Sequence, residues 1–247
     1  MPTPRSLGLP DDVRACLFDL DGVLTATATV HMAAWKRTFD GFLRSRDPQA
    51  PEFTQDDYNH HVDGKPRADG VRDFLASRGI TLPEGDPGDA PDAETVQGVA
   101  TRKNELVQRE LEEHGVEVYE GSMAYLRAVK EAGLATAVVT ASANGERVVA
   151  AGGFAELIDA RVDGVVAREE GLAGKPAPDT FLAGARALGV TPQEAVVFED
   201  ALAGVAAGRA GGFAFVVGVD RVGHADGLRE AGADVVVTDL AELLDRT

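Results

Sequence analysis

Cysteine, lysine and long apolar runs are all scarce in this sequence. Its 247 residues include one cysteine, Cys16, which cannot form a disulfide within the chain, and five lysines. No run approaches the roughly 18 apolar residues of a membrane span. The opening segment MPTPRSLGLPDD lacks the apolar stretch of a secretory signal. We therefore expect a cytoplasmic protein with no membrane partner.

Positive charge is also in short supply. The formal net charge is -17, which disfavours nucleic acid as a partner because a polyphosphate backbone needs a basic surface. An anionic substrate could bind only where a metal ion or a few placed cations reverse the field locally. Apolar residues still make up 44% of the chain, which is enough for a hydrophobic core.

The order of apolar patterns along the chain predicts an α/β fold with an insertion. Residues 12–18 resemble a buried strand, and from residue 117 onward strands and helices alternate with short connectors, which is typical of a parallel sheet covered on both faces. Between them, the apolar spacing is helical and no strand is evident. We expect a Rossmann-like core of residues 1–30 and 116–247, with a small α-helical cap domain inserted at 31–115.

Reactive side chains follow several of the predicted strands. Asp19 and Asp21 end the first, Thr140 ends the strand in LATAVVT, and Glu199 and Asp200 end EAVVFED. The carboxyl ends of parallel strands meet at the edge of a sheet where ligands bind. Asp21-Gly22 and the second acidic pair could instead be ordinary turns or solvated loops, and Thr140 a simple helix cap.

A pair of close carboxylates suggests a division of chemical roles. Like charges repel, so one carboxylate stays protonated unless a cation intervenes. This favours one nucleophile or metal ligand and one proton carrier, with Mg²⁺ bound by hard oxygen ligands. Lys175 lies in the segment AGKPAPDTF, where the prolines restrict the backbone. This suggests a lysine side chain held in a defined direction, although an ordinary surface lysine is the alternative.

Taken in order, these segments resemble the four motifs of the haloacid dehalogenase (HAD) superfamily: FDLDGVL, VVTAS, GKPAPD and VFEDALAG. The resemblance spans essentially the whole chain. It implies that Asp19 is a nucleophile that accepts a phosphoryl group and that Asp21 is a general acid and base. It also implies phosphate binding by Thr140 and Lys175. The implied Mg²⁺ ligands are Asp19, the Asp21 backbone carbonyl and Asp200, with Glu199 in or near the coordination shell.

The predicted cap resembles the β-phosphoglucomutase-like subfamily, in which this insertion is mobile and selects the substrate. The matching segments are T-x₃-H-x₃-W after the first motif, VDGKPRADGV, TRKNELV, and ASANG after the second. Arg67 falls on the arginine that binds the distal phosphate in that subfamily. His31 and Trp35 could equally be packing residues. The substrate-binding residues that the resemblance implies are His31, Trp35, Arg67, Lys103, Asn104, Ser142 and Asn144.

The resemblance implies a Mg²⁺-dependent phosphotransferase that isomerises β-glucose 1-phosphate to glucose 6-phosphate through the 1,6-bisphosphate. The alternative is a phosphatase of a sugar phosphate or similar small ester that uses the same residues. A non-catalytic sugar-phosphate sensor is a third reading, which the complete set of acidic and basic residues disfavours. In each case we expect a monomer whose partner is a small sugar phosphate.

Overall fold

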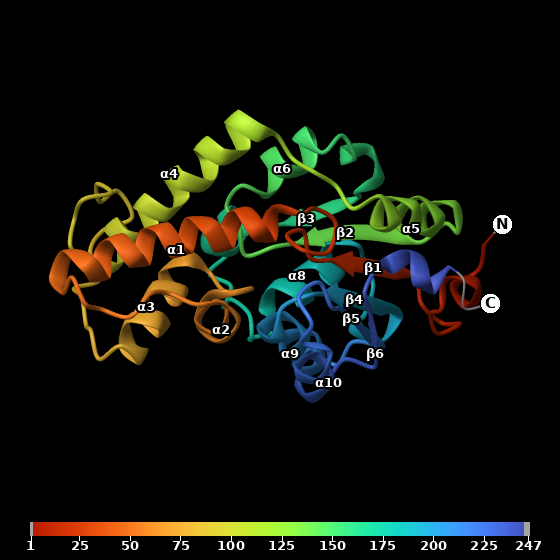
Figure 1. The fold of residues 1–247 in the computed structure, drawn as a ribbon. Coiled ribbons are helices and arrows are strands. Elements are labelled where there is room, and N and C mark those ends of the chain that lie inside the picture. The colour runs from red at the N-terminus through yellow and green to blue at the C-terminus, as the bar shows by residue number, and fades with distance from the viewer. Residues whose placement is uncertain (1, 245–247) are drawn as a thin grey trace. The chain divides into compact units, whose positions relative to one another are not determined.

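The computed structural model describes residues 2–244, which divide into two compact units. One comprises the chain before Thr27 and after Gly115, and the other is Thr27–Gly115 (Figure 1). The boundary expected between residues 30 and 31 falls inside helix α1, Thr27–Arg46. In the part of the chain that the structure describes, no helix is long and apolar enough to cross a bilayer.

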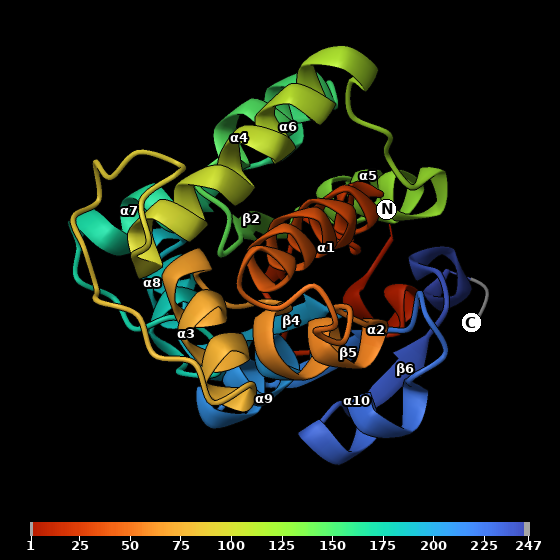
Figure 2. The ribbon, with the colours of Figure 1, turned by 60° about the vertical axis from the view of Figure 1, so that its left-hand side comes forward.

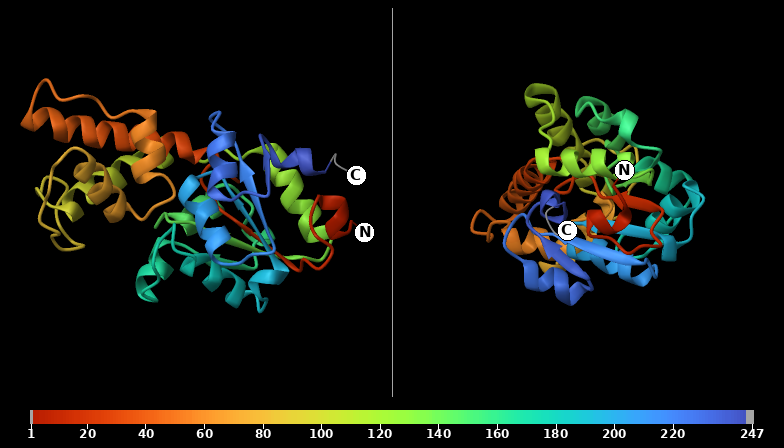
Figure 3. Two further views of the ribbon diagram at one scale, coloured as in Figure 1. Left: turned by 90° about the horizontal axis from the view of Figure 1, so that it is seen from below. Right: turned by 90° about the vertical axis from the view of Figure 1, so that its right-hand side faces the viewer.

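The first unit, called the core unit here, contains one six-stranded sheet of order β3-β2-β1-β4-β5-β6. Every neighbouring pair of strands is parallel, as the alternating pattern predicted. Figure 3 shows the sheet from two further directions. The strands are β1 Ala15–Phe18, β2 Ala135–Val139, β3 Ala160–Val162, β4 Ala195–Glu199, β5 Phe215–Val219 and β6 Val235–Val237.

Helices cover both faces of this sheet, and for that reason its central strands are apolar throughout. Successive side chains of a strand point to opposite faces. On one face, Leu17 and Val197 belong to an apolar cluster that includes residues of α8 and α9. On the other, Phe18 stacks on Phe198 with ring centroids 4.5 Å apart, and Tyr125 of α5 packs against both rings.

The helices of the core unit fill the connections between strands. They are α5 Glu120–Glu131, α6 Gly145–Ala151, α7 Gly164–Glu169, α8 Asp179–Ala187, α9 Leu202–Ala210 and α10 Ala225–Ala231. Short 3₁₀ helices lie at Pro4–Leu7, Ala155–Leu157, Pro192–Glu194 and Leu240–Leu243.

The 3₁₀ turn before β4 is closed by a reciprocal cap. Glu194 accepts hydrogen bonds from the amide and the hydroxyl of Thr191, both at 2.9 Å, and pairs with Arg14 at 3.0 Å. The Thr191 amide, the Arg14 guanidinium and the Thr191 hydroxyl lower the pKa of Glu194 from 4.5 to about 2. This ionised cap sets the start of β4, at whose far end the second acidic pair lies.

The second unit, called the cap unit here, is helical, as predicted (Figure 2). It consists of α1, α2 Gln55–Asp57, a π-helix at Tyr58–Val62, α3 Arg67–Ser77 and α4 Val96–His114. Its core is aromatic: Phe39 lies 4.9 Å from Trp35, 5.1 Å from Phe53 and 4.2 Å from Phe74, measured between ring centroids. The cap unit therefore has a hydrophobic core of its own.

Several short elements were absent from the sequence prediction, among them β3, α7 and the π-helix. Strand β3 has only three residues, and two of them are partly exposed, so it carries no clear apolar run. Helix α7 has only six residues, and none of them is buried to give it a periodic apolar pattern. The π-helix depends on side-chain packing of Tyr58 and Val62 in the cap, which local sequence does not encode.

Candidate active site

The carboxyl edge of the sheet brings together the reactive residues of the core unit. Asp19 directly follows β1, and its amide donates to the carbonyl of Phe198 in β4 at 2.9 Å. Thr140 follows β2, and its amide donates to the carbonyl of Val162 in β3 at 3.0 Å. Glu199 is the last residue of β4, and Asp200 follows it. The expected convergence on one sheet edge is present.

Lys175 reaches this edge from the loop before α8 and forms a buried ionic triad. Its ammonium donates to Asp19 Oδ1, to Glu199 Oε1 at 2.5 Å and to the carbonyl of Val139 at 3.1 Å. Lys175 is 3% exposed, Asp19 6% and Glu199 0%. Two carboxylates can be buried so close together because one ammonium lies between them.

The triad also sets the protonation of its members. Burial raises the pKa of Asp19 well above its ordinary value, and the charges of Glu199 and Asp21 add to this while Lys175 opposes it. Burial lowers the pKa of Lys175, but the two carboxylates outweigh burial and raise it above 10.5. Lys175 is therefore a permanent cation, and Asp19 depends on nearby cations to remain ionised.

Both carboxylate oxygens of Glu199 have donors from the protein. Oε1 accepts from Lys175, and Oε2 accepts from the amide of Ala201 at 2.8 Å. Gly204 of α9 packs directly against it, because a Cβ there would lie 1.7 Å from Oε1. These contacts fit a residue that holds Lys175 in place. Direct metal ligation by Glu199 remains a prediction.

Asp21 and the residues after β2 form the opposite side of the site. The Thr140 hydroxyl donates to Asp21 Oδ2 at 3.3 Å. It also accepts from the amide of Ser142 at 3.0 Å, and the Ser142 hydroxyl accepts from the amide of Asn144 at 3.2 Å. Asp21 is partly exposed, unlike Asp19. A carboxylate with access to solvent or substrate next to a buried one fits a proton carrier beside a nucleophile.

The oxygen atoms at this edge fit a divalent ion. Ligand atoms of Asp19, Glu199 and Asp200 lie within 4.8 Å of one another, and all three residues are buried. Gly22 has a φ of +90° and no side chain, and a Cβ there would lie 1.8 Å from Asp200 Oδ2. The turn after Asp21 therefore lies against the Asp200 carboxylate. Hard oxygen ligands of this kind suit Mg²⁺.

The cap unit groups three of the substrate-binding residues predicted from its resemblance. Lys103 of α4 is 2% exposed, and its ammonium lies 2.8 Å from His31 Nδ1 and 4.9 Å from the centroid of the Trp35 ring. Arg67 begins α3, and Asn104 follows Lys103 on α4; both are partly exposed. Trp35 also belongs to the aromatic core of the cap, so a packing role is established and a binding role remains a prediction.

Two further residues at the sheet edge were not singled out from the sequence. Arg221 follows β5 and donates to the carbonyl of Gly22 at 3.0 Å. His224 lies three residues later, with Nε2 3.0 Å from the carbonyl oxygen of Asp200. Their position in the sequence could have indicated them. Asp220 and Arg221 come directly after the apolar run of β5, as the candidate site residues come after β1, β2 and β4.

The parallel sheet, the acidic edge and the buried lysine define a class of phosphoryl-transfer enzyme, and comparison with known proteins agrees. A family model described as haloacid dehalogenase-like hydrolase matches residues 13–212. The chain belongs to this family and is an enzyme of the HAD superfamily, as its motifs predicted.

The most informative relatives are bacterial. The chain is 56% identical to the β-phosphoglucomutase of Mycobacterium bovis over 248 aligned positions, which cover 97% of this chain and 95% of the relative. The identity and coverage are the same for the β-phosphoglucomutase of Mycobacterium tuberculosis. These comparisons confirm the resemblance to the β-phosphoglucomutase-like subfamily.

Solved structures with the same fold include two at 25% sequence identity. One is β-phosphoglucomutase from Clostridium difficile, with a TM-score of 0.75 and coverage of 94% of this chain and 93% of that one. The other is CbbY from Rhodobacter sphaeroides in complex with phosphate, with a TM-score of 0.70 and coverage of 94% and 96%. The HAD fold expected from the sequence is confirmed.

Proposed function

We propose that this enzyme is a β-phosphoglucomutase, which converts β-glucose 1-phosphate into glucose 6-phosphate through β-glucose 1,6-bisphosphate. The observation that carries the proposal is 56% identity across 97% of the chain to enzymes of that name. The buried arrangement of Asp19, Lys175 and Glu199 supports it, because it provides a nucleophile with a fixed cation beside it.

Each half of the cycle moves one phosphoryl group between Asp19 and the sugar. The aspartyl phosphate of Asp19 passes its phosphoryl group to the 6-hydroxyl of β-glucose 1-phosphate, which restores the carboxylate and forms the bisphosphate. After the bisphosphate reorients, an Asp19 oxygen attacks the phosphorus at C1, and the bond from that phosphorus to the C1 oxygen breaks. Glucose 6-phosphate leaves, and the aspartyl phosphate is regenerated.

Asp21 accounts for the protons. It accepts the proton of the 6-hydroxyl in the first half and gives a proton to the departing C1 oxygen in the second. The hydrogen bond from the Thr140 hydroxyl to Asp21 Oδ2 helps to orient this carboxylate. Lys175 and Thr140 would bind the non-bridging phosphate oxygens.

Mg²⁺ fits the oxygen atoms at the sheet edge and would neutralise phosphate charge during transfer. Asp19, Asp200 and the backbone carbonyl of Asp21 would hold it. Glu199 would lie next to this shell, where it keeps Lys175 ionised and in position. With a net charge of -17, the protein needs such local cations to bind a dianionic substrate at all.

The cap unit supplies the residues that we assign to the sugar and its non-reacting phosphate. These are Arg67, Lys103, Asn104, His31 and Trp35, together with Ser142 and Asn144 of the core unit. The planar fork of an arginine suits a phosphate, so we assign the distal phosphate to Arg67. Without a binding site for this second phosphate, the bisphosphate would leave before it reoriented.

We further propose a cytoplasmic monomer. Among residues 2–244, Val222 is the one large apolar side chain that is exposed, which fits a surface without a large apolar interface. The strong negative charge also opposes self-association. Light scattering coupled to gel filtration should give a mass close to 25.9 kDa, and a mass near twice that value would contradict the proposal.

One product assay separates the candidate functions. The enzyme is given β-glucose 1-phosphate, Mg²⁺ and a trace of glucose 1,6-bisphosphate, and glucose 6-phosphate and free phosphate are followed separately. Formation of glucose 6-phosphate without free phosphate is expected. Stoichiometric free phosphate would identify a phosphatase, in which water attacks the same aspartyl phosphate. Binding of the sugar without either product would identify a sensor.

Asp19→Asn tests the nucleophile. The change removes a charge but almost no volume, so the fold should survive while turnover falls by at least about 1,000-fold. Circular dichroism checks the fold, and the product assay measures turnover. Residual turnover within about tenfold of wild type would contradict the assignment of Asp19.

Arg67→Ala tests the distal-phosphate site. Mutase turnover should fall by about 100-fold, while hydrolysis of a small ester such as p-nitrophenyl phosphate, which has no second phosphate, should change by less than about threefold. Arg109→Ala is the matched control, since Arg109 is an exposed arginine of the same unit. Equal losses in both assays would show that Arg67 supports the fold rather than the second phosphate.

A further inference from the structure

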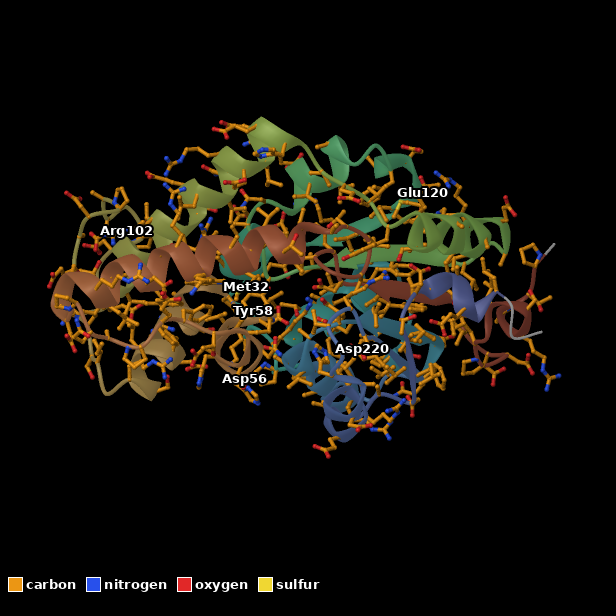
Figure 4. The ribbon with its side chains drawn as sticks, viewed as in Figure 1. Met32, Asp56, Tyr58, Arg102, Glu120 and Asp220 are labelled. Atoms are coloured by element: carbon orange, nitrogen blue, oxygen red, sulfur yellow. The ribbon has the colours of Figure 1, made fainter. Side chains whose placement is uncertain are left out.

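The loop after β5, Asp220–His224, contacts both segments that carry the proposed metal ligands; it is called the β5 loop here. Asp220 gives the loop its shape, because its Oδ1 accepts from the amides of Val222, Gly223 and His224 at 3.2, 2.7 and 2.9 Å. Oδ2 accepts from the amide of Ala225 at 3.1 Å. Asp220 is labelled in Figure 4. Four amides on one carboxylate fix this loop in a single conformation.

Arg221 extends from the β5 loop to the turn that follows Asp21. Its Nε donates to the carbonyl of Gly22 at 3.0 Å, and its Nη2 lies 3.5 Å from the carbonyl of Val23. The side chain is 15% exposed, and its guanidinium carbon lies 3.7 Å from the centroid of the Tyr119 ring. A largely buried guanidinium stacked on an aromatic ring has little freedom to move.

The remaining donors of Arg221 anchor it to the rest of the core unit. Nη1 donates to the carbonyl of Thr238 at 2.7 Å and to Asp239 Oδ2 at 3.0 Å. Nη2 donates to the Ser122 hydroxyl at 3.2 Å, and that hydroxyl itself donates to the carbonyl of Val23 at 2.7 Å. Arg221 thus connects the turn after Asp21 to the segment after β6 and to α5. A lysine, with one nitrogen, could make only some of these bonds.

His224 connects the same loop to the second acidic segment. Its Nε2 lies 3.0 Å from the carbonyl oxygen of Asp200. A carbonyl oxygen only accepts hydrogen bonds, so Nε2 carries the proton and donates. One rigid loop therefore binds main-chain carbonyls on both sides of the proposed metal site, at Gly22 and at Asp200.

We propose that Arg221 and His224 are positioning residues that fix the separation between the Asp21 carbonyl and the Asp200 carboxylate, and thereby set Mg²⁺ affinity and the rate of phosphoryl transfer. This inference depends on the proposed Mg²⁺ site. Residues that hold metal ligands from behind typically contribute about 10–100-fold to metal affinity or activity. Both side chains act through the main-chain carbonyls that they hold.

Calorimetric titration of Mg²⁺ into the metal-free protein tests the proposal without relying on turnover. Arg221→Ala and His224→Leu should each raise the Kd for Mg²⁺ by about 10–100-fold. Arg221→Lys should recover part of this loss because its ammonium can still reach one carbonyl. Arg229→Ala is the matched control: it removes an exposed arginine of neighbouring α10 whose partner, Asp226, is also exposed, and it should leave the Kd unchanged.

The outcomes distinguish this inference from the function on which it depends. Each variant is titrated well below its own melting temperature, measured by circular dichroism. A wild-type Kd for Arg221→Ala, together with a lower melting temperature, would show a purely structural role and overturn the inference. Absence of Mg²⁺ binding by the wild type would instead overturn the proposed metal site. Should Arg221→Ala not fold, Arg221→Lys and His224→Leu decide the question.

Discussion

Replacing Gly22 with alanine should weaken Mg²⁺ binding much more than it weakens the fold. The new Cβ would lie 1.8 Å from Asp200 Oδ2, and contacts below 3.0 Å essentially do not occur, so that oxygen must move by about 1.2 Å. Asp200 is a short side chain that can rotate away without disturbing the sheet. The collision is therefore relieved by moving a proposed metal ligand.

The size of the effect follows from this displacement. Metal–ligand distances tolerate changes of only about 0.2 Å, so a carboxylate displaced by 1.2 Å no longer serves as a ligand. Disturbing the groups that hold metal ligands typically costs about 10–100-fold in metal affinity or activity, and displacing a ligand itself should cost at least as much as the upper end of that range. We expect the Kd for Mg²⁺ to rise by about 100-fold, which corresponds to about 2.7 kcal/mol. The φ of +90° at residue 22 adds about 1–2 kcal/mol of backbone strain to the cost in stability.

A second glycine separates the two contributions. Gly133 has a φ of +76°, and a Cβ there would meet nothing within 4 Å. Gly133→Ala should therefore lose a similar amount of stability, measured by urea unfolding, and keep its Kd for Mg²⁺, measured by calorimetry. The reasoning is refuted if Gly22→Ala binds Mg²⁺ as tightly as the wild type, or if both variants lose affinity equally.

Three further perturbations test other parts of the molecule. Lys175→Met should abolish turnover and cost about 3–5 kcal/mol in urea unfolding, because it leaves Asp19 and Glu199 buried without their cation; unchanged stability would contradict the triad. The folded-state pKa of Glu194 is lowered to about 2, so its cap stabilises the protein above pH 4.5 and is lost as the pH falls toward 2. Wild type should therefore melt at a higher temperature than Glu194→Gln at pH 7, and the two should converge near pH 2; a constant difference would exclude this linkage. Phe39→Ala removes the centre of the aromatic core of the cap and should cost about 3–5 kcal/mol in unfolding of that unit, with a loss below 1 kcal/mol counting against the packing described.

Much of the site could be predicted because its residues directly follow strongly apolar strands. Asp19, Thr140 and Asp200 needed only two facts: that β1, β2 and β4 are parallel, and that parallel strands end at one edge. The first helix of the cap could also be predicted, since Trp35, Phe39 and Phe42 recur at helical spacing.

Contacts between distant segments could not be predicted in the same way. The pairing of both Glu199 oxygens with Lys175 and the Ala201 amide depends on how a loop 24 residues away folds back. Arg221 lies 199 residues from Gly22, and only the placement of β5 two strands from β1 brings the two together. The local sequence around Arg221 and His224 contains no pattern that predicts their contacts with Gly22 and Asp200.

The amino-acid sequence by itself indicated the candidate chemical groups of this protein: the carboxylates and the hydroxyl that end the strands, and a lysine in the stiffened loop before α8. These follow from local composition and periodicity, which act over a few residues. The tertiary structure alone decided how those groups are paired, ionised and held. Burial and charge proximity, which set the state of Asp19 and Lys175, arise only when strands far apart in the chain lie side by side.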